Sequence, residues 1–188
     1  ETRNSPQPRI FDSPGQATGS GATTVNSGAR LSGAGSLGGT LHVAAGGVDS
    51  PGDSPGILDS GDVSFDTTSV FIVELNGLTV GTEYDQLNVT GTVNLNSDGL
   101  DGATLQLSSQ LTAYPSGAEF QIVNNDGSDP IQGTFAGLAE GDIIRVNGVP
   151  LTISYVGGDG NDVTLTVAPP NPVFIDPNFD FPFAGVDP

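Results

Sequence analysis

The sequence predicts an all-β fold, built as a β-solenoid with extended N- and C-terminal arms. Three observations carry this prediction. Glycine (28 residues) and proline (14 residues) are abundant, and no window places apolar residues at helical spacing. Apolar and polar residues alternate over many short segments, which is the period of a β-strand. In the first half of the chain these segments are evenly spaced and separated by glycine-rich turns.

The first element is an N-terminal arm over residues 1–20, "ETRNSPQPRIFDSPGQATGS". It is polar and carries several prolines, and its clearest apolar feature is the pair Ile10 and Phe11. Such a composition does not build a core of its own, so we expect an extended segment.

From about Ala22 onward, short strands alternate with turns rich in Gly, Ser and Asn. The clearest strand pattern is "DQLNVTGTVNL", in which the apolar residues face inward and the Asn and Thr residues between them face outward. The segments "ATLQL", "EFQIV", "PLTISY" and "DVTLTV" continue the period of two. The residues expected on the inward face before residue 100 are Leu41, Val43, Val63, Phe65, Phe71, Val73, Leu75, Leu87, Val89, Val93 and Leu95.

Strands this short cannot bury an apolar face on their own, but they do so when stacked as successive coils. We therefore expect one solenoid domain over residues 21–168, with Val, Leu and Ile in a narrow core. Thr and Asn would then form ladders on the outside.

Two stretches resemble a known family. "TTVNSGARLSGAGSLGGTLHVAAGGVDSPGDSPG" resembles the passenger-associated transport repeat of autotransporters and related bacterial surface proteins. "VELNGLTVGTEYDQLNVTGTVNL" and "ISYVGGDGNDVTLTV" are similar to the segment that follows this repeat. The resemblance covers roughly residues 21–167. It implies a right-handed parallel β-helix outside a bacterial cell that serves as a stalk or folding scaffold, and it implies no catalytic activity.

The net charge of the chain restricts the classes of molecule that can bind it. Twenty-two acidic and four basic residues give a formal net charge of -18. Such a surface repels nucleic acid and anionic lipid, and it attracts divalent cations or basic partners. No apolar run approaches the roughly 18 residues that a membrane helix needs, so we expect no nucleic-acid partner and no membrane insertion.

Composition also argues against an enzyme. Without cysteine there is no disulfide, thiol nucleophile or cysteine-ligated zinc. Glycoside hydrolysis needs two carboxylates across a cleft, and lyases typically need a basic residue beside calcium. Two of the four arginines lie in the N-terminal arm, and most acids lie in turns. His42, the single histidine, is expected to face outward as a surface residue.

The stretch "GGDGNDVTLTV", residues 157–167, resembles a calcium-binding nonapeptide. However, Thr164 occupies the place of the inward apolar residue, and no second copy exists to share an ion. We therefore expect a turn in which Gly157, Gly158 and Gly160 supply positive φ angles. A calcium ion bound through Asp159 and Asp162 remains the alternative. No cofactor is required in either case, and calcium would be a modest stabiliser.

A second acidic stretch, "VDSPGDSPGILDSGD", carries Asp49, Asp53, Asp59 and Asp62. Carboxylates at this density can gather a cation. The doubled Ser-Pro-Gly favours a pair of turns instead, because proline fixes φ before each glycine.

The last element is a C-terminal arm over residues 169–188, rich in Pro and Phe. Every second residue from 173 to 183 is apolar, which predicts an extended segment with one apolar face. An exposed face of this kind favours docking on another surface, either the solenoid of the same chain or a neighbouring copy, and we expect the neighbouring copy. The predicted assembly interface consists of Ile10, Phe11, Val173, Ile175, Phe179, Phe181 and Phe183.

These observations together predict an extracellular structural protein at a bacterial cell surface. It would be the self-assembling subunit of a filament or layer, joined to further copies of itself through its terminal arms. The alternative is a surface adhesin, or a carbohydrate-binding β-helix fragment of a larger passenger, with a cell-surface glycan as its partner.

Overall fold

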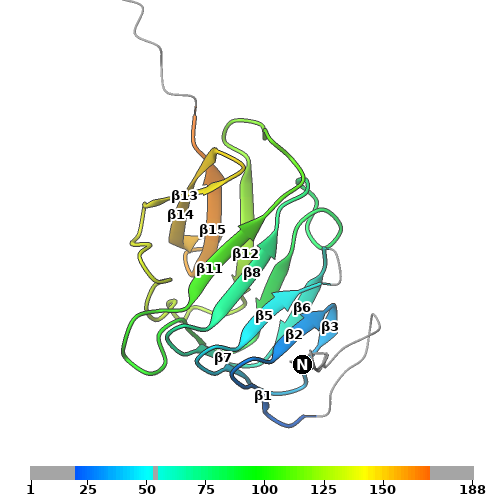
Figure 1. Ribbon diagram of the computed structural model, residues 1–188, viewed down its shortest axis with the longest axis vertical. Coiled ribbons are helices and arrows are strands. Elements are labelled where there is room, and N and C mark those ends of the chain that lie inside the picture. The colour runs from blue at the N-terminus through cyan, green and yellow to red at the C-terminus, as the bar shows by residue number, and fades with distance from the viewer. Residues whose placement is uncertain (1–19, 53–54, 170–188) are drawn as a thin grey trace, which may run out of the picture.

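The computed structural model describes residues 20–52 and 55–169, and within these ranges the protein is all-β, with fifteen strands and no helix (Figure 1). This confirms the predicted all-β class. No helix in these ranges is long and apolar enough to cross a membrane. The strands are β1 (Thr23–Val25), β2 (Arg30–Gly33), β3 (Gly35–Ser36), β4 (Leu41–Val43), β5 (Val48–Pro51), β6 (Ile57–Ser60), β7 (Val63–Phe65), β8 (Val70–Glu74), β9 (Gln86–Val89), β10 (Val93–Asn94), β11 (Thr104–Ser108), β12 (Glu119–Asn125), β13 (Ile143–Val146), β14 (Val149–Gly157) and β15 (Asp162–Val167).

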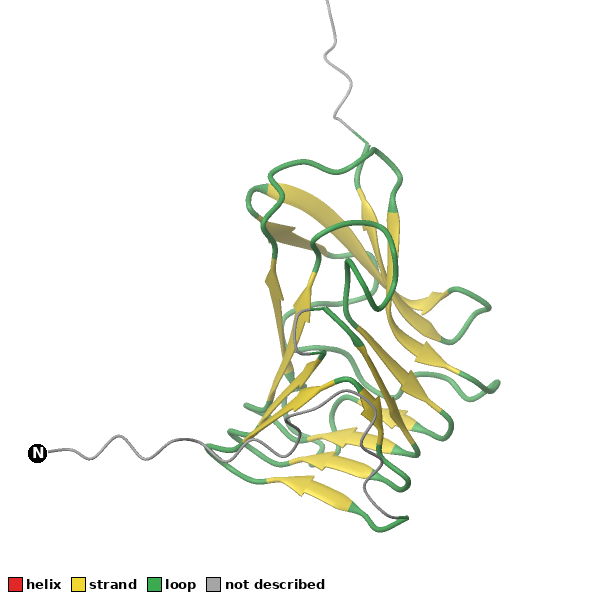
Figure 2. Ribbon diagram, turned by 90° about the vertical axis from the view of Figure 1, so that its right-hand side faces the viewer, coloured by secondary structure: helices red, strands yellow, loops and turns green. Residues whose placement is uncertain are grey.

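The chain visits three sheets in turn, adding one strand to each before returning to the first. One sheet has the order β1-β4-β7-β10, the second has β2-β5-β8-β11, and the third begins with β3-β6-β9-β12. All pairings among these twelve strands are parallel. Figure 2 shows the strands of successive passes stacked one above another at the N-terminal end of the molecule.

The third sheet continues beyond β12 through β15 and β14 to β13, and these pairings are antiparallel. Here the structure differs from the parallel coils expected as far as residue 168. The reason is the length of the connections: β13 and β14 are joined by two residues, and antiparallel strands alone can be joined so tightly.

The inward faces of the three sheets enclose one core. Every residue before 100 that was expected on the inward face is at most 1% exposed, so the period-two prediction is confirmed there. The inward residues stack in register from strand to strand. Leu41 pairs with Val63 and Val63 with Val93, while Val43 pairs with Phe65. This stacking is what allows strands of two to five residues to bury their side chains.

An aromatic residue from a loop closes the core at its C-terminal end. Phe135 lies between β12 and β13 and is fully buried. Its ring stacks on the Phe71 ring, with the ring centres 6.0 Å apart, and its centre lies 6.2 Å from the centre of the Tyr155 ring. The Phe135 N–H donates to the Tyr155 hydroxyl (2.9 Å), which in turn donates to the Leu138 carbonyl (2.8 Å). The long loop is thus held to the core by both packing and hydrogen bonds.

Candidate functional site

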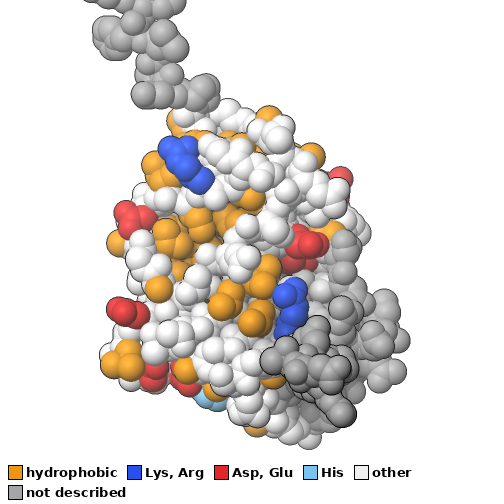
Figure 3. Space-filling view, viewed as in Figure 1, with side chains coloured by type: hydrophobic (Ala, Val, Ile, Leu, Met, Phe, Trp, Pro, Cys, Tyr) orange, Lys and Arg blue, Asp and Glu red, His pale blue; other side chains and the backbone are white. Residues whose placement is uncertain are grey.

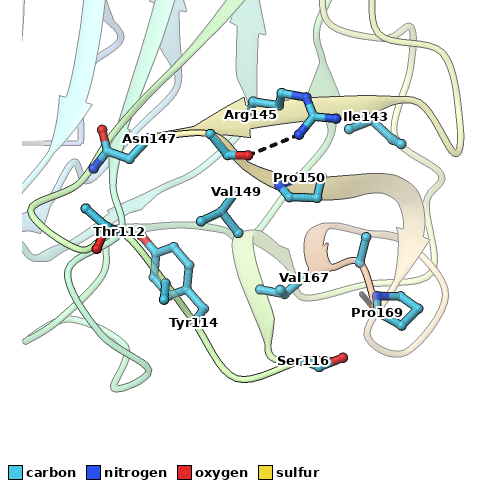
Figure 4. A pocket seen from close by; sticks show the side chains of 13 residues that line it. Thr112, Tyr114, Ser116, Ile143, Arg145, Asn147, Val149, Pro150, Val167 and Pro169 are labelled. Atoms are coloured by element: carbon cyan, nitrogen blue, oxygen red, sulfur yellow. Dashed lines mark hydrogen bonds between the residues drawn. The ribbon is translucent and has the colours of Figure 1, made fainter. Parts of the chain in front are cut away.

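An apolar groove of about 910 Å³ lies at the C-terminal end of the described chain (Figure 4). Three segments far apart in the sequence form it: the loop 112–116, the β13–β14 hairpin, and the end of β15. Its lining residues are Thr112, Ala113, Tyr114, Ser116, Ile143, Arg145, Asn147, Gly148, Val149, Pro150, Val167, Ala168 and Pro169. No local pattern in the sequence indicates this groove.

A tight turn positions one side of the groove. Asn147 (φ 48°) and Gly148 (φ 84°) form the two-residue connection between β13 and β14, with Val146 paired to Val149. Positive φ at both positions is characteristic of the type I′ hairpin turn that an Asn-Gly pair favours. The Asn147 amide donates to the carbonyls of Ser109 (2.9 Å) and Leu111 (2.7 Å). These bonds tie the hairpin to the chain that leads into the loop 112–116.

Tyr114 anchors the opposite side. Its hydroxyl donates to the Leu75 carbonyl (2.5 Å) and lies 2.6 Å from Ser109 Oγ. Its ring packs edge-on against buried Phe120, with ring centres 5.3 Å apart. Burial raises the pKa of the Tyr114 phenol above its usual value, and the hydrogen bond with Ser109 opposes this shift. The loop is therefore held rigidly by a tyrosine whose polar group is already used within the protein.

The groove is apolar with a single charge. Ile143 on β13 is 54% exposed, and Val149, Pro150 and Val167 add aliphatic surface. Arg145 is the only ionisable side chain apart from Tyr114 among the lining residues, and its Nη1 donates to the Gly148 carbonyl (3.0 Å). Arg145 and Pro150 face each other in the hairpin register. In a chain with a net charge of -18, a groove with one arginine and no acid is chemically distinct.

Residues 157–162 form a turn, as predicted, and hydrogen bonds to the Asp162 carboxylate hold it. One Asp162 oxygen accepts from the Asn125 N–H (2.8 Å), and the other accepts from Gln121 Nε2 (2.6 Å) and the Asp159 N–H (3.3 Å). Asp162 is buried and Asp159 is exposed. Both Asp162 oxygens are thus bound to donors of the chain itself. The turn was the prediction, and calcium binding through Asp159 and Asp162 stays its untested alternative.

One detail of that turn was predicted wrongly. Gly158 (φ 55°) and Gly160 (φ 117°) have positive φ, but Gly157 does not. Gly157 ends β14, where it pairs with Asp162, and a Cβ there would lie 2.3 Å from Thr164 Oγ1. Glycine is needed at 157 because of close cross-strand approach, not because of its backbone angle.

Two acidic residues, Asp49 and Asp85, are buried. The sequence predicted a turn at Asp49 and gave no indication for Asp85. Asp49 is in β5, not in a turn, and pairs with Leu31 on one side and Phe71 on the other. It is fully buried, and neither carboxyl oxygen has a hydrogen-bond partner among the described residues. Burial raises the pKa of Asp49 from 3.8 to about 7. The Ser50 backbone and the Arg30 charge oppose this shift, and the nearby Asp85 adds to it. Aligning successive strands of this sheet could have shown Asp49 at an inward position.

Asp85 is also buried but has partners. Its two oxygens accept from the backbone N–H groups of Gly56 and Glu74, each at 2.8 Å. Burial raises its pKa to about 7, while these two hydrogen bonds act in the opposite direction. Asp85 therefore holds together the β5–β6 connection and the end of β8. Among the described residues, no group of three or more His, Cys, Asp or Glu side chains is placed to hold a metal ion.

His42 lies on the outward face of β4, as predicted, but it has neighbours that the sequence did not reveal. Its Nδ1 is 3.0 Å from Ser64 Oγ, and its Nε2 is 3.4 Å from Asp66 Oδ2. The register places Thr24, His42 and Ser64 side by side on β1, β4 and β7. These three polar side chains lie in a row across the outer face of the sheet, in which His42 and Ser64 are hydrogen-bonded, and the groove lies elsewhere in the chain.

The predicted assembly interface lies outside the described residues. Ile10, Phe11, Val173, Ile175, Phe179, Phe181 and Phe183 all lie outside the described residues, as do residues 1–19 and 170–188 of the predicted arms. The described chain ends at Pro169, in the wall of the groove.

Comparisons with protein-family models, with curated proteins and with solved structures found no match to this chain.

Proposed function

We propose that the chain is an extracellular structural protein, the self-assembling subunit of a bacterial surface filament or layer. Its framework is a right-handed parallel β-helix formed by β1 to β12 and extended by the antiparallel strands β13 to β15, and it is joined to further copies through the terminal arms. The observation that carries this proposal is the parallel pairing of every third strand, in which each pass of the chain adds one strand to each of three sheets. Repeat architectures of this kind grow along one axis and suit stalks and fibres.

The N-terminal end of the framework supports assembly. β1, β2 and β3 are the outermost strands of the three sheets among the described residues, with three, four and two residues. An outermost strand carries backbone groups that can pair with an added strand. Such an end is suited to receive another copy.

The surface chemistry supports an extracellular location and excludes some partners. A net charge of -18 keeps an exposed protein soluble and repels nucleic acid and anionic lipid. The proposed partners are further copies of the chain and, secondarily, a cell-surface glycan. The proposal includes neither membrane insertion nor a required cofactor.

The proposal assigns no reaction to the chain. His42 contacts its register partner Ser64 on β7 and Asp66, which directly follows β7, on the outer face of the sheet and away from the groove. The glycan-binding alternative is less well supported, because Tyr114 is the single aromatic side chain among the described residues that line the groove. In the groove, the Tyr114 hydroxyl and the Asn147 amide are both bonded within the protein.

Sedimentation velocity and negative-stain electron microscopy of the full 188-residue chain test this function. We expect concentration-dependent particles of more than one subunit and elongated assemblies on the grid. A full chain that stays monomeric at high concentration, with and without calcium, would contradict the proposal. Binding to a glycan array by such a monomer would favour the adhesin alternative.

A further inference from the structure

We propose that the groove between the loop 112–116 and the β13–β14 hairpin binds the apolar segment 173–183 of the C-terminal arm of a second copy. The inference rests on the proposed self-assembly and specifies its joint. It combines the chemistry of the groove, the sequence of the arm and the place where the described chain ends.

The apolar surfaces match. The groove offers Ile143, Val149, Pro150 and Val167, and Ile143 is 54% exposed although it is aliphatic. Figure 3 shows hydrophobic side chains gathered at the end of the molecule where β13 and β14 lie. The arm has an apolar residue at every second position, including three phenylalanines at 179, 181 and 183. Burying aromatic side chains in an aliphatic groove removes both apolar surfaces from water.

The charges match as well. The segment 170–188 carries Asp176, Asp180 and Asp187 and no basic residue. A chain with a net charge of -18 repels such an arm over most of its surface, whereas the groove presents Arg145 and no acid. In Figure 3 a basic side chain stands beside the hydrophobic group at this end of the molecule. Electrostatic complementarity of this kind selects the docking surface and its orientation.

The position of Pro169 favours a second copy over the arm's own chain. Pro169 lies in the groove wall, so the arm starts at the groove. Pro170 and Pro172 follow, and each proline favours an extended conformation for the residue before it. Ten extended residues span about 33–36 Å, which carries Phe179 away from its own groove and toward a neighbour. Docking on its own chain would require the arm to reverse direction, for example at Asp176-Pro177-Asn178.

Three full-length variants test the joint. Ile143→Asp alters the groove, and the triple variant Phe179→Ser, Phe181→Ser, Phe183→Ser alters the arm. Val156→Asp is the matched control, because Val156 is also an exposed aliphatic residue (64% exposed) on the same hairpin but does not line the groove. Circular dichroism and thermal melting check that all three variants fold like the wild type, as expected for Ile143 and Val156 because both are exposed.

In sedimentation velocity we expect the wild type and Val156→Asp to assemble alike. The groove variant and the arm variant should each assemble at least about tenfold more weakly, as expected when a charge or a serine replaces buried apolar contacts. Mixing the two defective variants should restore association but stop at pairs, because the mixture contains only one intact groove and one intact arm per pair.

Each other outcome overturns the inference in a distinct way. If Ile143→Asp assembles like the wild type while the arm variant does not, the arm docks elsewhere and the proposed self-assembly survives. If the mixture never associates and Ile143→Asp only makes residues 170–188 more sensitive to protease, the arm docks on its own chain. If the arm variant assembles like the wild type, the arm has no part in assembly. If the wild type itself stays monomeric, the proposed function also fails.

Discussion

Asp49 of β5 is in register with Phe71 of β8, so that a carboxyl group and a phenyl ring are neighbours in the same core. Both residues are fully buried. Charge on such a carboxyl is unfavourable because burial removes it from water, and the opposing backbone contact with Ser50 is too weak to reverse the effect. The protonated form is therefore the one compatible with the fold.

This relationship predicts that the protein is more stable in mild acid than at pH 8. Asp49 and Asp85 have pKa values of about 7 in the folded protein, against a usual 3.8. The folded state therefore holds these protons more tightly than the unfolded chain. The stability they contribute is complete below about pH 4 and is lost as the pH rises through about 7. Melting temperatures measured from pH 4 to pH 8.5 check this.

The variant Asp49→Asn isolates the effect, because asparagine imitates the protonated carboxyl. We expect Asp49→Asn to gain of order 1 kcal/mol at pH 8, or about 2–4 °C in Tm for a chain of this size, and little at pH 4. Asp101→Asn, at an exposed position, is the control and should follow the wild-type pH profile. A loss of stability in Asp49→Asn at pH 8 would mean that the ionised carboxyl has a partner in the folded protein.

An aspartate substitution should destabilise the protein strongly on the inward face of β11 and only slightly on its outward face. Leu105 points into the core and is 6% exposed, while its neighbour Gln106 is exposed. Leu105→Asp places an unpaired charge in the core, and we expect a loss of at least about 3 kcal/mol or failure to fold. Gln106→Asp should remain within about 0.5 kcal/mol of the wild type. Urea denaturation measures both, and similar losses in the two variants would refute the assignment of faces.

A row of polar side chains on the outside of the third sheet should stabilise the stacking of strands. Asn88 Nδ2 donates to Asp59 Oδ1 (2.9 Å), and Asn124 Nδ2 donates to Asn88 Oδ1 (3.2 Å). These three residues are register partners on β6, β9 and β12. Asn88→Ala should cost about 1–2 kcal/mol, because two hydrogen bonds are lost at a half-buried site. Thr104→Ala, at an exposed position with no side-chain hydrogen bond among those of the described residues, is the control.

The turn at 157–162 makes a prediction about metal removal. Asp162→Ala leaves the buried Asn125 N–H without its acceptor, which should cost about 1–3 kcal/mol. Because this role needs no ion, we expect Asp162→Ala to lose the same stability in EDTA as in millimolar calcium. The wild-type Tm should differ by only a few degrees between these two conditions. The exposed Asp159→Ala should be nearly neutral. A wild-type shift of tens of degrees that Asp162→Ala abolishes would establish a calcium site instead.

Local patterns in the sequence determined which residues of the parallel strands face the core. Leu87, Val89, Val93 and Leu95 are buried as their alternation predicted, since the side-chain period of a strand is a property of the backbone itself. The turn at Gly158 and Gly160 was predictable for the same reason, because it depends on φ angles that only a few residue types readily adopt.

Only the tertiary structure decided which strands pair, and therefore where the antiparallel end begins and where the groove lies. Its walls come from segments around residues 114, 145 and 168, and no local pattern relates segments so far apart. Asp49 shows the same limit: its position beside Phe71 follows from the register of β5 on β8, and an inward carboxyl contradicts the hydrophobic pattern from which faces are predicted. The register and the pairing of distant strands depend on the free energy of the whole core. A local sequence pattern therefore does not predict them.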